Sequence, residues 1–159
     1  MQWTKDNYVL TDDNDLLKLS EIERLLKQSY WANGYSAAKI ERLIKNSCCL
    51  GLYLNGCLVG FARMVTDKET VTTITDFIID AACQDQGLGS WLMKCLTEHP
   101  ELSQTSMTLG TQDKDSFYER FGFERNGSFT HRSPRPPMPK QSDRPPHRRP
   151  GFPPLRKNP

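Results

Sequence analysis

The segment Gln84-Asp85-Gln86-Gly87-Leu88-Gly89-Ser90 constrains the fold more than any other part of the chain. It follows a β-branched run, Val71 to Ile79, and it opens a helical stretch, Ser90 to Thr97. A glycine-bearing turn from strand to helix points several backbone N–H groups into one concavity at the positive end of the helix, which suits a diphosphate. An ordinary turn also uses two glycines, so the spacing alone leaves phosphate binding and a plain turn both open.

The composition indicates one soluble domain with its own core, since 36% of the 159 residues are hydrophobic and 25% are charged. No apolar run approaches the roughly 20 residues of a transmembrane helix. Met1 to Asp6 has neither the basic start nor the apolar segment of a secretory signal. The sequence therefore predicts a cytoplasmic protein without a membrane partner.

The five cysteines form no CxxC pair and have no histidine at ligand spacing. They lie in apolar, strand-like or helical surroundings, which is typical of buried reduced thiols. We expect neither a metal site nor a disulfide framework.

Charge and proline content divide the chain into two parts. Residues 125–159 hold nine Lys/Arg and one acid, a charge of +8, which leaves twelve Lys/Arg and eighteen acids before them, a charge of −6. Ten of the eleven prolines lie in residues 133–159. Proline lacks an N–H and fixes φ, so this segment cannot build a helix or an inner strand. The sequence predicts a globular domain over residues 1–131 and a disordered, proline- and arginine-rich tail over residues 132–159.

The first third of the chain reads as a strand followed by two helices. Trp3 to Leu10 ends in an apolar run and predicts a single short strand. Ser20 and Glu23 form a capping box that predicts a helix start, and this helix is expected to end at Gly34. Ser36 is the predicted cap of the second helix.

A β-meander is predicted next. The apolar runs Cys48 to Leu54 and Cys57 to Val65 flank Asn55-Gly56, the strongest short-range hairpin signal, because both central residues of a type I′ turn need positive φ. Val71 to Ile79 then supplies the third strand.

Asp76 is an acidic residue on a mostly apolar face of that third strand. By the period of two it shares a face with Ile74 and Ile78, and an acid between isoleucines is costly to bury unpaired. Either Asp76 is an ordinary solvated residue at a cleft, or its ionisation state is used.

A second motif, Phe117-Tyr118-Glu119-Arg120-Phe121-Gly122-Phe123, stands about 30 residues after the glycine loop, at the end of a helix that Asp115 is expected to cap. This pair of motifs, QxxGxG and FYERFGF, resembles the GCN5-related N-acetyltransferases (GNAT family), and the likeness runs from about Trp3 to Glu124. The resemblance implies an α/β (α+β) GNAT fold. In it a mixed, mostly antiparallel sheet of about five to seven strands is flanked by about four helices, and a splayed strand pair holds the cofactor.

The resemblance implies acetyl-CoA as cosubstrate and no metal. Its implied cofactor-binding residues are the loop Gln84, Asp85, Gln86, Gly87, Leu88, Gly89 and Ser90 for the pyrophosphate, Thr111 at a family asparagine position, and Phe77, Ile78 and Ile79, whose backbone meets the pantetheine. A backbone N–H of the last three residues would polarise the acetyl carbonyl as an oxyanion donor does.

The resemblance also implies catalytic and acceptor residues. Tyr118 matches the tyrosine that donates a proton to the departing thiolate, and Asp76 falls where several members keep a carboxylate that deprotonates the acceptor amine, directly or through water. Tyr30, Trp31 and Tyr35 lie where the family borders its acceptor cleft. Capping of the core by these aromatic residues is the alternative.

Three features depart from the family pattern. Asp85 stands where a small or basic residue is usual, and its charge should repel a diphosphate. Thr111 replaces an asparagine. Only Arg125 to Phe129 remain for the final hairpin, which is therefore not expected to form fully.

Three function classes follow. The leading one is an acetyl-CoA-dependent N-acetyltransferase that acetylates a primary amine of a small molecule by direct attack in a ternary complex. The others are a non-catalytic GNAT-fold module that binds acyl-CoA, and an interaction protein whose tail docks an SH3- or WW-like groove or an acidic partner. The tail charge supports at most weak, salt-sensitive nucleic-acid binding. The acceptor and a homodimer stay open.

Overall fold

The structure of the protein is a computed structural model that describes residues 1–126 and 129–132. The predicted tail therefore lies outside the described residues except for Arg132. The strands are β1 (Gln2–Lys5), β2 (Tyr8–Thr11), β3 (Cys48–Leu54), β4 (Cys57–Thr66), β5 (Val71–Ile79), β6 (Ser106–Leu109), β7 (Glu124–Asn126) and β8 (Phe129–Arg132), and the α-helices are α1 (Leu19–Leu26), α2 (Ala37–Lys45), α3 (Leu88–Thr97) and α4 (Asp115–Glu119). No helix among these residues has the length and hydrophobicity needed to cross a bilayer.

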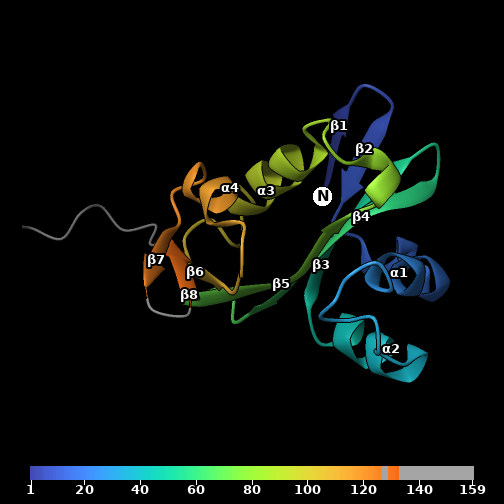
Figure 1. Cartoon of the computed structure of the whole chain (residues 1–159), viewed down its shortest axis with the longest axis horizontal. Helices are drawn as coiled ribbons and strands as arrows, with labels where there is room; N and C mark the ends of the chain where they lie inside the picture. The colour runs from blue at the N-terminus through green and yellow to red at the C-terminus, as the bar shows by residue number, and fades with distance from the viewer. Residues whose placement is uncertain (127–128, 133–159) are drawn as a thin grey trace, which may run out of the picture.

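The strands form one sheet in the order β1-β2-β3-β4-β5-β6-β8-β7. Neighbours are antiparallel except for β5 and β6, which run parallel. Helices α1 and α2 lie on one side of the sheet, and α3 and α4 lie on the other (Figure 1). The predicted mixed, mostly antiparallel sheet with four helices is confirmed.

Each helix pair buries its own core against the sheet. Ile22, Leu25 and Leu26 fall at helical spacing on α1, and all three are buried in the core that α1 and α2 share with β4. Leu92 and Leu96 of α3 are fully buried in the core on the opposite face. The sheet is thus covered on both sides and can hold α3 and α4 in fixed positions.

Two local predictions are confirmed by backbone geometry. Asn55 and Gly56 have φ values of 50° and 82° at the turn between β3 and β4, as the hairpin requires. The Ser36 hydroxyl accepts the backbone N–H of Lys39 at the start of α2.

The single strand predicted over Trp3 to Leu10 was wrong. This segment folds into the hairpin β1–β2, with Asp6 at a φ of 52° in the turn between them. Asp tolerates the left-handed region better than most residues, and this allows a tight reversal inside what reads as one run. The added strand contributes to a sheet of eight strands among the described residues.

The predicted helix ends need correction. Helix α1 begins at Leu19 after Lys18, which makes no side-chain cap hydrogen bond, so the capping box of Ser20 and Glu23 is wrong. The helix ends at Leu26 rather than Gly34. Asp115 is no cap either, because it is the first residue of α4.

The final hairpin, which the sequence did not predict, is present. Strand β8 pairs with β7 on one side and with β6 on the other. Both strands are very short and β7 is polar and exposed, so no alternating pattern marks them in the sequence. The hairpin closes the sheet beyond β6.

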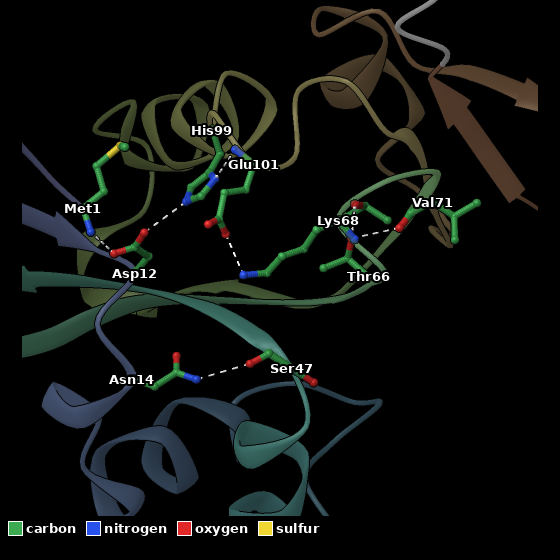
Figure 2. A network of polar contacts seen from close by, with 10 residues as sticks. Met1, Asp12, Asn14, Ser47, Thr66, Lys68, Val71, His99 and Glu101 are labelled. Carbon is green, nitrogen blue, oxygen red and sulfur yellow. Dashed lines mark hydrogen bonds and ion pairs between the residues drawn. The ribbon is translucent and has the colours of Figure 1, made fainter.

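A polar network fixes the C-terminal end of α3 (Figure 2). The Nδ1 atom of the buried His99 accepts the backbone N–H of Glu101 at 3.2 Å, so Nε2 carries the proton and donates to Asp12 Oδ2 at 3.1 Å. The side chain of Glu101 also takes part, because Lys68 Nζ donates to Glu101 Oε2 at 2.6 Å. The network links the end of β2, the end of α3 and the turn between β4 and β5.

Because β8 ends at Arg132, a chain that stops there keeps every described element. We expect removal of residues 133–159 to leave the melting temperature unchanged. The matched control stops after Asn126, which removes β8 and leaves β6 unpaired on one side, and it should melt several degrees lower. Circular dichroism on heating measures both variants. A comparable drop in the longer variant would contradict the proposed domain boundary.

Candidate active site

The parallel strands β5 and β6 separate in the middle of the sheet. Their pairing runs from Val71 with Ser106 to Ile74 with Leu109. Strand β6 then ends, whereas β5 continues for five residues to Ile79. A cavity of about 910 Å³ opens beside this part of β5 and is also lined by the glycine loop, by α4 and by the segment between α1 and α2.

A β-bulge bends β5 just past its last pair with β6. Opposite β4, the register steps from Phe61 with Ile78 to Arg63 with Thr75, so one β4 residue faces both Asp76 and Phe77. Asp76 has a φ of 47°, which is rare for a residue other than glycine. An extra residue of this kind bends its strand and turns its backbone groups away from the regular ladder.

The bulge is held by a buried ion pair. Arg63 Nε donates to Asp76 Oδ2 at 2.6 Å, and Arg63 Nη1 donates to Ser47 Oγ at 3.0 Å. Only 10% of the Arg63 side chain and 3% of the Asp76 side chain are exposed. Asp76 is therefore neither an ordinary solvated residue nor an unpaired buried acid. A proton taken up by its carboxylate would leave the Arg63 charge buried without its counter-charge.

The glycine loop leaves an open concavity at the start of α3. Gly87 occupies the N-cap with a φ of 75°, and no side chain caps the helix there. A Cβ placed on Gly87 would meet nothing within 4 Å, and one on Gly89 would only touch Ile79 and Phe117 at 3.7 Å. The glycines thus keep the first-turn amides of α3 open to the cavity, which fits an anionic group such as a diphosphate.

Ten of the eleven predicted cofactor residues line the cavity, and Gln86 is the exception. The lining includes Phe77, Ile78, Ile79, Gln84, Asp85, Gly87, Leu88, Gly89, Ser90 and Thr111. The Gln86 side chain instead accepts a hydrogen bond from Tyr8 Oη at 3.2 Å. Gln84 Nε2 donates to the Ile79 carbonyl at 3.1 Å and so ties the loop to the end of β5.

Tyr118 of α4 lines the same cavity with 9% of its surface exposed. Its ring packs against Phe77, Phe117 and Phe123, with centroids 5.0–6.3 Å apart. Burial, followed by the nearby charge of Asp113, raises the pKa of Tyr118 to about 12. The phenol is therefore held neutral and can give a proton to an anion formed in the cavity.

The predicted acceptor residues lie together at the opposite wall. Tyr30, Trp31 and Tyr35 all line the cavity. Tyr30 and Trp31 are 64% and 43% exposed, and their rings meet edge to face at 5.1 Å. Core capping therefore does not account for these two side chains. Tyr35 is half-buried against the α1–α2 core, and Lys39 Nζ lies over its ring, 3.6 Å from the ring centroid.

Sequence reasoning missed three cationic residues of the cavity. Arg63, Lys114 and Arg120 line it. Arg63 interrupts the apolar run of β4, and that interruption was an available signal. Arg120 lies inside the FYERFGF motif, two residues after Tyr118, and that position was an available signal.

Comparison with known proteins agrees with this geometry. The model of the acetyltransferase (GNAT) domain matches residues 45–125, which is 81 of the 159 residues. The chain therefore belongs to the GNAT acetyltransferase family.

Individual relatives cover most of the chain. A protein of Gibberella zeae with a provisional acetyltransferase name is 29% identical over 80% of this chain and 85% of its own length. A GNAT-family protein from Xanthomonas campestris pv. campestris has a TM-score of 0.73 and 29% identity, covering 78% of this chain and 89% of that one. A GNAT-family acetyltransferase from Elizabethkingia anophelis, solved with acetyl-CoA bound, has a TM-score of 0.61 at 17% identity and covers 77% and 79% of the two chains.

Removal of either partner of the Arg63–Asp76 pair should destabilise the fold. Asp76→Asn leaves a buried guanidinium without a counter-charge, and we expect it to lower the free energy of unfolding by about 3–5 kcal/mol. Urea denaturation measures this. The double variant Asp76→Asn with Arg63→Met removes both charges, keeps a residue that tolerates a φ of 47°, and should recover part of the loss. A single variant as stable as the wild type would contradict the structural role of the pair.

Proposed function

We propose that the protein is an acetyl-CoA-dependent N-acetyltransferase that acetylates a primary amine of a small molecule by direct attack within a ternary complex. One observation carries this proposal. A single cavity brings together the open amides of α3, the bulged end of β5 and the buried neutral phenol of Tyr118. Membership of the GNAT family supports the same reaction class.

The donor would be held by backbone groups. The first-turn amides of α3 would bind the diphosphate, since they combine unpaired donors with the positive end of the helix dipole. The end of β5, Phe77 to Ile79, lies beyond the pairing with β6 and offers a strand edge for the amide groups of a pantetheine arm. A backbone N–H there would stabilise negative charge on the carbonyl oxygen.

Tyr118 would supply the proton for the leaving group. The amine nitrogen attacks the thioester carbonyl carbon, a C–N bond forms, the C–S bond breaks, and its electron pair passes to sulfur. Tyr118 donates its proton to that sulfur. A neutral amine loses one proton in the same reaction, and this proton restores the phenol through water. The net reaction from the free amine therefore consumes no external base.

Asp76 would position the site rather than deprotonate the amine. Its carboxylate is already occupied by Arg63 at 2.6 Å, and protonation would cost the ion pair that holds the bulge. The alternative, in which Asp76 is the general base, predicts that the folded fraction of Asp76→Asn loses turnover while it still binds acetyl-CoA.

The decisive experiment is a screen of primary amines with acetyl-CoA, with thiol release as the readout. The proposal expects turnover with at least one class of small amine, and mass spectrometry should find the acetylated nitrogen. Binding of acetyl-CoA without turnover across a broad screen would favour the non-catalytic acyl-CoA-binding module instead.

Tyr118→Phe separates an enzyme from a binding module. The ring and its packing remain, so the dissociation constant for acetyl-CoA should hardly change. The proton donor is lost, so kcat and kcat/KM should fall together by about 10²–10⁴-fold. In the wild type, a phenol with a pKa of about 12 should cause no loss of kcat up to pH 10. Full activity in the variant would exclude this role.

Asp85→Asn should strengthen donor binding. Asp85 has a φ of 60° in the loop, and asparagine accepts this conformation while it removes the charge. Loss of the repulsion between a carboxylate and a diphosphate should lower the KM for acetyl-CoA severalfold at low salt and less at high salt. Initial rates at two ionic strengths measure this, and an equal KM at both would show that the carboxylate does not face the phosphates.

A further inference from the structure

The loop of the proposed donor site carries too little positive charge to balance the phosphates of a coenzyme A thioester. Residues Gln84 to Ser90 include no lysine or arginine and one aspartate. Backbone amides supply only partial charges, whereas a coenzyme A thioester carries a diphosphate and a ribose 3′-phosphate. A cation from another element would have to meet this charge.

Three cationic side chains line the cavity, and one of them is already compensated. Arg63 is bound to Asp76 and Ser47. Lys114 and Arg120 remain. Of these two, Arg120 is the one that lies over Phe117, the ring next to Gly89 of the glycine loop.

Arg120 is held beside the glycine loop by aromatic packing. Its guanidinium carbon lies 5.1 Å from the ring centroid of Phe117 and 6.0 Å from that of Phe121. Phe117 also reaches within 3.7 Å of the Cβ position of Gly89. One phenylalanine ring thus separates the guanidinium from the concavity at the start of α3. A guanidinium over an aromatic ring has five N–H donors and can still donate to a phosphate.

No ion pair of the described residues involves Arg120. Arg125 differs, because it donates to Asp115 at 2.5 Å. Arg120, the C-cap residue of α4, is exposed, whereas Tyr118 within the helix is buried. The thioester end of a donor would meet Tyr118, so its phosphate-bearing end would lie toward the more exposed side, where Arg120 stands.

We propose that Arg120 is the phosphate-binding cation of the acyl-donor site and determines its preference for phosphorylated donors. This inference rests on the proposed function, because it assumes that the donor is a coenzyme A thioester. The diphosphate and the 3′-phosphate offer the same chemistry, and donors that lack one or both of them distinguish the two.

The test measures dissociation constants by calorimetry for acetyl-CoA, acetyl-3′-dephospho-CoA and S-acetylpantetheine. Arg120→Met keeps the aliphatic stem over Phe117 and removes the charge. We expect it to weaken acetyl-CoA binding about tenfold at low salt, as loss of a charge-assisted contact does. S-acetylpantetheine binding should not change. Arg42→Ala, an exposed arginine of α2 outside the cavity, is the control and should bind all donors as the wild type does.

Each outcome has one meaning. If acetyl-CoA binding weakens and dephospho-CoA binding does not, Arg120 contacts the 3′-phosphate, and if both weaken equally it contacts the diphosphate. Unchanged acetyl-CoA binding, or an equal loss for S-acetylpantetheine, would overturn the inference and leave the proposed function intact. A wild-type chain that binds no acetyl-CoA would instead defeat the proposed function itself.

Discussion

The buried ion pair between Arg63 and Asp76 is the interaction on which the rest of the site depends. A bulge with a non-glycine residue at a φ of 47° is unfavourable for a strand by itself. The carboxylate at that position is fixed by a guanidinium that is itself bound to Ser47 of the turn before β3. Three consecutive parts of the sheet therefore hold the bend in β5, and the bend leaves the end of β5 free of β6.

The same bend shapes the cavity of the candidate active site. Strand β6 stops at Leu109, and β8 and β7 complete the sheet on its far side. Helix α4 lies between β6 and β7 in the chain and carries Tyr118, while the fully buried Phe123 anchors its end. Tyr118 thereby packs edge to face against Phe77, the second residue of the bulge. Tyr118 and the free end of β5 therefore line the same cavity.

The sequence alone was sufficient to predict the features that local chemistry determines. The Asn55-Gly56 turn, the Ser36 cap and the glycine loop each follow from backbone conformations or hydrogen bonds a few residues long. Features that depend on contacts between distant residues could not be predicted from the sequence. Arg63 and Asp76 pair across two strands, and nothing in the sequence around either residue identifies the other as its partner. The hairpin β7–β8 is stable because β6 offers an edge to it, which strand propensity over three or four residues does not reveal.

Phosphate contacts and proton donation would contribute to turnover in different ways. Acetyl-CoA and the product CoA carry the same phosphates, so the α3 amides and Arg120 would bind substrate and product alike. Such uniform binding lowers KM but cannot raise kcat, and it slows release of the product when it is too strong. Tyr118, in contrast, would act only where charge gathers on sulfur. In these terms Asp85 would not be a defect of the proposed donor site, because a carboxylate that weakens phosphate binding would speed release of CoA without any cost to the chemical step.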